Sequence, residues 1–264
     1  MTASPTNSNE SLAGRGLDGK SVLIVGGTSG IGRATAITLV AAGARVMVGG
    51  RRRSEGEETV ALAKQAGGEA RFMAMDTAKA ADHTETVAAT VAAWGRLDGA
   101  FNNAGTEGTM APLHEQTDED FDRVVAINQK GVFFGMREQI RQMLTQGGGA
   151  IVNTSSIGGV VGFANTSLYC GTKHAVIGMT RSAALEVGGS NIRVNAIAPG
   201  ATRTRVLSNM SGGEAEAEAN ANAIPLGRIA TPAEVADAVA WLLSDHASYV
   251  TGHTLLADGG FTAQ

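Results

Sequence analysis

The sequence contains little of several residue types, and each shortage narrows the class of protein. A single cysteine, Cys170, leaves no intrachain disulfide possible and fits a reducing compartment. Aromatic residues make up only 4% of the chain. The core must therefore be built from alanine, valine, isoleucine and leucine, which suits helices packed closely on a parallel sheet. No apolar run approaches the roughly 18 residues of a membrane-spanning helix.

Charge of one sign and grouped metal ligands are also scarce. The formal net charge is −4, and the only basic run is Arg51–Arg53, whereas nucleic-acid-binding proteins usually present a larger basic face. The five histidines show no metal-ligand spacing with one another or with Cys170. Residues 1–16 lack the basic start and apolar stretch of a signal peptide, so we expect a flexible tail. These absences favour a cytoplasmic protein with a small-molecule substrate and without a metal, a nucleic acid or a membrane as partner.

Short apolar runs alternate along the chain with longer segments of helical periodicity. Strand–helix–strand repetition predicts an α/β fold, in which a doubly wound, mostly parallel sheet of about seven strands carries helices on both faces. A chain of 264 residues can form such a fold undivided, so we expect residues 17–264 to be a single domain. The predicted strands are Ser21–Val25, Arg45–Val48, Arg71–Met75, Leu97–Phe101, Ala150–Thr154, Ile192–Ala198 and Thr254–Ala257.

Two helices are marked by signals at their ends. Ser54 and Glu57 have the spacing of a capping box, which predicts a helix over about Glu55–Ala66. A second helix is predicted over Ser167–Val187, and glycine pairs follow both segments. The biased segment Ser211–Ala223 fits neither a strand nor an amphipathic helix, and it is either a solvated helix or part of a mobile lid.

A glycine-rich turn follows the first predicted strand and precedes a helix. Its glycines permit a tight turn and a close backbone approach to a pyrophosphate. The N–H groups and positive dipole end of the following helix would face that anion. A plain strand-to-helix turn is the alternative, and the position between strand and helix favours the dinucleotide site. The candidate cofactor-binding residues in this turn are Gly26, Thr28, Ser29, Gly30, Ile31 and Gly32.

The residues after the second predicted strand bear on the type of dinucleotide. An acidic residue at this place would bind the ribose hydroxyls of NAD. Here Gly50 is followed by Arg51, whose planar guanidinium suits a phosphate. We therefore favour NADP(H) and keep NAD(H) as possible, and we expect Arg52 and Arg53 to be solvated.

Tyr169 and Lys173 form a pair at positions i and i+4, on one helix face. A phenol with a pKa of about 10 is a poor base at neutral pH. A nearby ammonium lowers that pKa, and a drop of three units takes roughly 4 kcal/mol. A surface tyrosine above an unrelated lysine is the alternative. Ser156 ends the fifth predicted strand, where its hydroxyl and the phenol could bind one substrate oxygen, while Ser155 faces the other side of the strand.

Further polar and glycine residues follow the other strands, and the ends of parallel strands meet at one sheet edge. In order and spacing, these residues resemble the short-chain dehydrogenase/reductases, in their single-domain branch with a Rossmann-like sheet. The resemblance covers nearly everything from Lys20 to Gln264. It is carried by the glycine turn 26–32, Asn102-Asn103-Ala104-Gly105, Asn128, Ser156, Tyr169, Lys173 and Pro199-Gly200.

The resemblance implies a role for each catalytic residue. Tyr169 is the acid/base, Lys173 lowers its pKa and holds the nicotinamide ribose, and Ser156 orients and polarises the substrate oxygen. Asn128 holds a water that relays protons to Lys173. The family also implies a homotetramer, assembled through the last strand and tail (Thr251–Gln264) and two long helices.

The resemblance further implies contacts with the dinucleotide. Asp76 meets the adenine with Thr77 beside it, Asn102 meets the adenosine side, and Thr202 and Thr204 meet the nicotinamide end. The remaining implied cofactor-binding residues are Ala104, Gly105, Pro199 and Gly200. Two positions depart from the family: Val25 replaces the threonine that braces the glycine turn, and Thr77 replaces a common apolar residue.

These observations predict reversible hydride transfer between NADP(H) and a secondary alcohol/ketone pair. A lyase or epimerase on the same scaffold is an alternative, but such relatives tend to carry an extra substrate domain for which this chain has no room. A non-catalytic binding or regulatory protein is the other, and the intact set of catalytic residues argues against it. The substrate pocket is expected from Thr106–Leu113, Gly158–Leu168 and Arg203–Arg228, which carry no dominant charge.

Overall fold

Seven parallel strands form one sheet in the order β3-β2-β1-β4-β5-β6-β7. The computed structural model describes residues 16–263, so the predicted tail, apart from its last residue, lies outside the described residues. This sheet confirms the predicted fold class. The strands are β1 (Ser21–Val25), β2 (Arg45–Gly50), β3 (Ala70–Ala74), β4 (Gly99–Asn102), β5 (Gly149–Thr154), β6 (Ile192–Pro199) and β7 (Thr254–Ala257).

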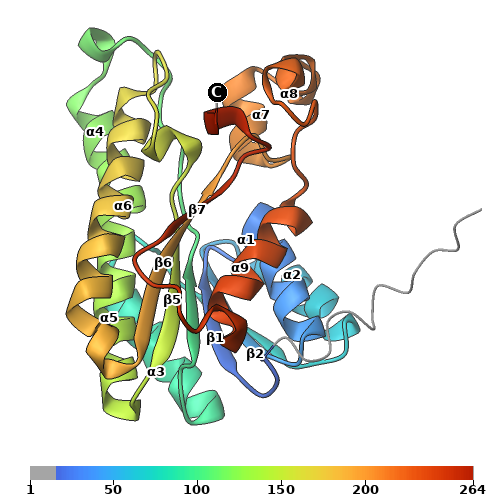
Figure 1. Cartoon of the computed structure of the whole chain (residues 1–264), viewed down its shortest axis with the longest axis vertical. Coiled ribbons are helices and arrows are strands. Elements are labelled where there is room, and N and C mark those ends of the chain that lie inside the picture. Colours follow the sequence, from blue (N-terminus) through green and yellow to red (C-terminus); the bar gives the residue numbers. More distant parts are fainter. Residues whose placement is uncertain (1–15, 264) are drawn as a thin grey trace, which may run out of the picture.

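The helices cover both faces of the sheet, as Figure 1 shows. One face carries α1 (Gly30–Ala41), α2 (Arg53–Gln65) and α9 (Pro232–Leu243), and the other carries α3 (Ala80–Trp94), α5 (Gly131–Gln146) and α6 (Ser167–Val187). The remaining α-helices are α4 (Asp118–Val125), α7 (Arg205–Ser211) and α8 (Glu214–Ala219). The second predicted helix has the predicted bounds. Among the described residues, no helix combines the length and the apolar content needed to cross a membrane.

The core lies in two apolar layers because successive side chains of a strand point to opposite faces. In β1, Ile24 packs with Leu39 and Val239 on the side of α1 and α9. Its neighbour Leu23 packs with Val132 on the other side. Each fully buried side chain of this kind contributes about 1.5–3 kcal/mol to stability. The strands are consequently almost purely apolar, which is why their runs are visible in the sequence.

The start of α2 differs from the prediction. The helix begins at Arg53, so Ser54 lies inside it and forms no capping box with Glu57, which pairs with Arg53 instead. The physical reason is that β2 continues to Gly50 and that the residue before the helix is held by its side chain at the turn after β1. A capping box does occur at α9, where Thr231 and Glu234 bond each other's backbone N–H.

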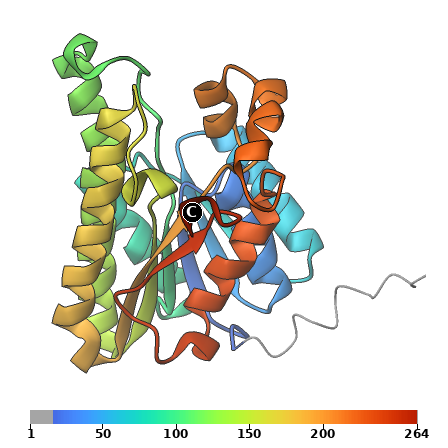
Figure 2. The same cartoon turned by 45° about the horizontal axis from the view of Figure 1, so that its top comes forward.

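The carboxyl ends of all seven strands meet at one edge of the sheet, below α7 and α8 (Figures 1 and 2). The chain order reverses between β1 and β4, and in open α/β sheets ligands bind at such a switch point. The segment that carries α7 and α8 has a small apolar cluster of its own, in which Ala221, Ile224 and Ile229 are buried against Leu207 and Phe261. The biased segment predicted as a solvated helix or a lid is thus partly helical and stands over the strand ends.

A buried amide network joins β4, β5 and α5 below this edge. Asn102 Nδ2 donates to Gln139 Oε1 at 2.9 Å and to Asn153 Oδ1 at 2.8 Å, and Gln139 Nε2 returns a bond to Asn102 Oδ1 at 2.8 Å. Asn153 Nδ2 reaches Thr180 Oγ1 on α6 at 3.0 Å. Because the hydrogen bonds of the Asn102 amide are all made inside the protein, this side chain belongs to the core and does not face the cavity above it.

We predict that Asn102→Ala lowers the free energy of unfolding by about 2–4 kcal/mol, because buried polar atoms of Gln139 and Asn153 lose their partners. Urea unfolding measures this change. The exposed Gln65→Ala variant is the control and should stay within about 0.5 kcal/mol of the wild type. A loss for Asn102→Ala no larger than that of the control would contradict this account of the network.

Candidate active site

The glycine turn after β1 approaches the loop after β4 more closely than any side chain would permit. Gly26 has φ +86°, and a Cβ there would lie 2.5 Å from the backbone N of Ala104. A Cβ on Gly32 would lie 2.2 Å from the Gly26 carbonyl oxygen. Asn103 secures this approach, because its Nδ2 donates to the same carbonyl at 2.8 Å. The bracing that Val25 cannot supply therefore comes from Asn103.

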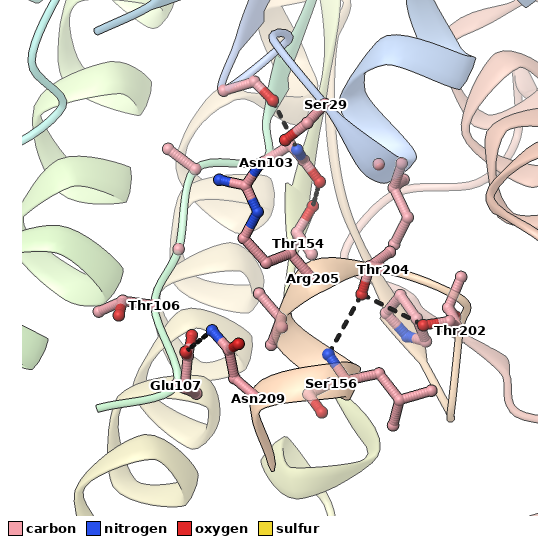
Figure 3. A pocket seen from close by; sticks show the side chains of 18 of the residues that line it. Ser29, Asn103, Thr106, Glu107, Thr154, Ser156, Thr202, Thr204, Arg205 and Asn209 are labelled. Atoms are coloured by element: carbon pink, nitrogen blue, oxygen red, sulfur yellow. Dashed lines mark hydrogen bonds between the residues drawn. The ribbon is translucent and has the colours of Figure 1, made fainter. Parts of the chain in front are cut away.

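A cavity of about 910 Å³ opens over the strand ends, between this turn and α6 (Figure 3). Most of the predicted site residues line it: Gly26, Thr28, Ser29, Gly30, Ile31, Arg51, Thr77, Ala104, Gly105, Ser156, Tyr169, Lys173, Pro199, Gly200, Thr202 and Thr204. The predicted pocket segments contribute Thr106, Glu107, Phe163 and all of α7. One elongated cavity thus joins the predicted dinucleotide and catalytic residues.

Four predicted residues do not line the cavity. Gly32 packs against the Gly26 carbonyl, and Asn102 belongs to the buried amide network. The Asp76 carboxylate accepts from the backbone N–H of Ala78 at 3.1 Å. The fourth is Asn128, in the π-helical turn η2 (Ala126–Lys130) between α4 and α5.

Asn128 is fully buried and holds the loop after β4 from below. Its Oδ1 accepts from the Thr106 N–H at 2.8 Å, and its Nδ2 donates to the Thr106 carbonyl at 2.8 Å. A Cβ on Gly105 would lie 3.4 Å from both Asn128 Oδ1 and Lys173 Nζ. The Asn128 amide and the Lys173 ammonium therefore lie on either side of the same point beside Gly105.

Arg52 remains partly exposed, as expected, but its side chain also lines the cavity, which the sequence analysis did not predict. Arg52 Nη2 donates to Thr28 Oγ1 at 3.0 Å and to Ser29 Oγ at 2.8 Å, and its guanidinium also pairs with Glu55 at 3.3 Å. The backbone at Arg52 is extended, and this conformation directs the side chain over the glycine turn. Arg51 lines the cavity as well, with an exposed side chain.

Arg53 points elsewhere, since it pairs with Glu57 at 3.3 Å and covers the Phe72 ring. Three adjacent arginines cannot be told apart by composition. The tertiary contacts of Arg52 with Thr28 and Ser29 place it at the cavity, and the sequence carries no local signal for these contacts.

The catalytic candidates converge at the other end of the cavity. Ser156 lies two residues after the end of β5, where its Oγ accepts from the Gly158 N–H at 3.1 Å, and its hydroxyl acts on the Tyr169 phenol by lowering the pKa of that group. Ser155 is buried and donates to the Lys173 carbonyl at 2.9 Å. Of the two serines, Ser156 is therefore the one whose hydroxyl meets the phenol.

Lys173 lies one turn after Tyr169 on α6. Its Nζ donates to the Thr154 carbonyl at 2.9 Å and lies 5.6 Å from the centroid of the Tyr169 ring. Burial lowers the pKa of the Lys173 ammonium to about 8. Burial also raises the pKa of the Tyr169 phenol, and the Ser156 hydrogen bond opposes this only in part. Without a cofactor, desolvation of both groups therefore outweighs the expected assistance from the lysine.

Comparison with known proteins gives consistent results over nearly the whole chain. Residues 25–262 match the family model described as enoyl-(acyl carrier protein) reductase. The chain is 48% identical over 249 residues to 2,5-dichloro-2,5-cyclohexadiene-1,4-diol dehydrogenase of Sphingobium indicum, which covers 94% of this chain and 98% of that one. It is 38% identical over 255 residues to cyclohexanol dehydrogenase of an Acinetobacter species, with 97% and 100% covered. The crystal structure of levodione reductase superposes with a TM-score of 0.91 at 40% identity, covering 93% of this chain and 98% of that one.

The chain belongs to the short-chain dehydrogenase/reductase family. It is an oxidoreductase that acts on CH–OH or C=O groups, and members of this family use NAD(P). The resemblance drawn from the motifs is thereby confirmed.

The residues at the glycine turn fit the dinucleotide that this family uses. The turn presents backbone instead of side chains to the cavity, because Gly26 and Gly30 both have positive φ values. The helix α1 begins at Gly30, so its first N–H groups face the same space. Ser29, Thr28 and the Arg52 guanidinium add donors suited to phosphate oxygens.

We predict that the buried Lys173 ammonium makes this short-chain dehydrogenase/reductase more stable at alkaline pH. Above pH 8 the folded protein loses the Lys173 proton, while the unfolded chain keeps it until about pH 10.4. The unfolded state then binds more protons, so the free energy of unfolding rises with pH by about 3 kcal/mol between about pH 8 and pH 10.

The nearly isosteric variant Lys173→Met should lack this rise. Urea unfolding of both proteins without cofactor, at several pH values in that window, measures the difference. Other titrating groups are common to both proteins and largely cancel. A wild-type minus variant difference that stays constant across the window would show that Lys173 is not desolvated in the folded state.

Proposed function

We propose that this protein transfers a hydride reversibly between NADP(H) and a secondary alcohol/ketone pair, with Tyr169 as the acid/base. One observation carries the proposal: Tyr169 and Ser156 line the same cavity, with the Lys173 ammonium 5.6 Å from the centroid of the Tyr169 ring. This set stands at one end of a cavity whose other end is the glycine turn. The bound dinucleotide supplies the hydride acceptor or donor.

The side chains supply the proton and the charge stabilisation. In reduction, the phenol gives its proton to the carbonyl oxygen, and burial favours this direction because it raises the pKa of Tyr169 and keeps the phenol protonated. The Ser156 oxygen already accepts from the Gly158 N–H, so its O–H can donate to the developing alkoxide. Lys173, anchored on the Thr154 carbonyl, places positive charge behind the phenol.

In oxidation, the same phenol must lose its proton. A positive charge that enters the cavity beside Tyr169 favours the phenolate, so an oxidised nicotinamide acts in the same sense as the Lys173 ammonium. The apparent pKa of this step then belongs to the coupled group and not to Tyr169 alone. We also propose that a water beside Asn128 passes protons to Lys173, which the closeness of the two side chains across Gly105 supports.

Two named relatives support cyclic secondary alcohols as substrates, since one is a cyclohexanol dehydrogenase and the other acts on a cyclohexadiene diol. The family model carries the description of an enoyl reductase, but these relatives are dehydrogenases of alcohols. The contact between Ser156 and Tyr169 argues against a non-catalytic binding protein, because binding alone requires no phenol–hydroxyl pair. No observation favours a lyase or an epimerase.

The expected homotetramer and the cytoplasmic location stay predictions. For the assembly, support comes from large apolar side chains that are exposed on two long helices, namely Phe133 and Leu144 on α5 and Leu185 on α6. The interfaces expected from the family resemblance use two long helices in this way.

We predict that Tyr169→Phe lowers turnover at least about a hundredfold, because general acid–base catalysis contributes about a hundredfold to ten-thousandfold. The change removes one oxygen and little volume, so the binding of NADPH should persist. Steady-state kinetics with a cyclic ketone and fluorescence titration with NADPH measure the two effects.

Tyr249→Phe is the matched control, since Tyr249 is the other tyrosine of the chain and is fully exposed. It should leave both measurements unchanged. If Tyr169→Phe keeps more than about a tenth of the wild-type turnover, a different group donates the proton.

We predict that Arg52→Ala and Arg51→Ala each raise the Kd for NADPH by about tenfold or more and change the Kd for NADH much less. The additional phosphate of NADPH is the group that a guanidinium at the glycine turn would bind. Arg53→Ala is the matched control, because Arg53 pairs with Glu57 outside the cavity. Titration of the four proteins with both cofactors is the measurement. A wild-type preference for NADH would refute the proposed NADP(H) specificity.

A further inference from the structure

Glu107 is the one carboxylate among the described residues that line the cavity. It lies in the loop after β4 and is partly buried. The other charged side chains of the wall are cations: Arg51, Arg52, Lys173, Arg203 and Arg205. A single negative charge in a wall otherwise rich in cations must influence which ligands the cavity admits at that place.

The carboxylate stands at the substrate end of the cavity. Glu107 follows Thr106, whose backbone is held by Asn128 on the side of Lys173, and the Glu107 charge raises the pKa of the Tyr169 phenol. In Figure 3, Arg205 extends toward Asn103 and Ser29, whereas Glu107 meets Asn209 away from that end. The arginines near the glycine turn would therefore act on the dinucleotide, whereas the Glu107 carboxylate would act on the substrate.

The Glu107 carboxylate can accept more hydrogen bonds than it accepts in this structure. Its Oε1 accepts from Asn209 Nδ2 on α7 at 2.6 Å, and its other oxygen has no hydrogen bond with the described residues. A carboxylate offers about four lone-pair sites, so further donors can be accommodated. A group that enters the cavity beside Tyr169 therefore meets an acceptor that is charged and only partly used.

We propose that Glu107 is a specificity-determining residue that accepts a hydrogen bond from a second hydroxyl group of the substrate and disfavours substrates that carry a carboxylate. The inference rests on the proposed alcohol/ketone function and deepens it, since it names neutral alcohols with more than one hydroxyl as the substrate class. A hydrogen bond to an ionised acceptor is roughly twice as strong as a neutral one. An anionic substituent at the same place meets a like charge, which disfavours its binding.

A simpler role for Glu107 would be to latch α7 onto the loop after β4 through Asn209. Two substitutions separate these roles. Glu107→Gln keeps an acceptor for the Asn209 amide and removes the charge. Asn209→Ala keeps the charge and removes the latch. A specificity role is sensitive to the first substitution, and a latch is sensitive to the second.

The experiment compares kcat/KM for cyclohexanol, the positional isomers of cyclohexanediol and a hydroxycyclohexanecarboxylate. The proteins are the wild type, Glu107→Gln, Asn209→Ala and, as matched control, Glu119→Gln, which is exposed on α4 outside the cavity. Ratios between substrates are the readout, because they cancel any common change in folding or in cofactor binding.

In the wild type, the best diol should exceed cyclohexanol about tenfold in kcat/KM. Glu107→Gln should lower that ratio at least about fivefold and raise the hydroxy acid relative to cyclohexanol about tenfold. Asn209→Ala and Glu119→Gln should keep the wild-type ratios.

Turnover without any diol preference, or ratios that change in Asn209→Ala and not in Glu107→Gln, overturns the specificity role of Glu107 and leaves the proposed function intact. Absence of turnover on every alcohol with both cofactors overturns the proposed function, and the inference with it.

Discussion

The structure depends most on one constraint: a lysine ammonium is held inside the protein. Lys173 has a single hydrogen bond to the chain among the described contacts, to the Thr154 carbonyl at the end of β5. An ammonium in this position is poorly solvated, which is why its pKa falls to about 8. Burying an ammonium with so few partners is costly unless a ligand can contact it, and the cavity gives a ligand access to Lys173. The path of β5 and the start of α6 hold this ammonium at the wall of the cavity.

The parallel sheet is what brings distant residues to that ammonium. The turn after β1, the loop after β4 and the end of β5 are neighbours only because β1, β4 and β5 are adjacent in the sheet. Each strand contributes a different property: backbone donors after β1, a braced loop after β4, and the Ser156 hydroxyl after β5. Because the strands themselves are buried in two apolar layers, these end residues can be polar without weakening the core.

The sequence was sufficient for the elements whose signals are local. Apolar runs located all seven strands, and the helix from Ser167 to Val187 was found with its bounds. The predicted capping box at Ser54 failed because tertiary contacts of Arg52 with Thr28 and Ser29 set where α2 begins. The same contacts explain why Arg52 was left out of the site, while Asn102 was included although its amide is occupied in the core. Glu107 lies inside the predicted pocket segment Thr106–Leu113, but no motif distinguishes it there, and its hydrogen bond to Asn209 joins residues about a hundred positions apart.

The separate apolar cluster of the segment that carries α7 and α8 has a consequence for the dynamics of turnover. Ala221, Ile224 and Ile229 pack among themselves and with few neighbours, apart from the two main layers. Opening of this segment would thus expose only a small apolar area, and its free energy would be a fraction of that of global unfolding. The amide hydrogens of this segment would exchange with solvent through such local openings. Exchange of the amide hydrogens of β1 and β4 would require unfolding of the whole sheet. Entry and release of ligands can therefore proceed on their own timescale without disturbing the geometry around Tyr169.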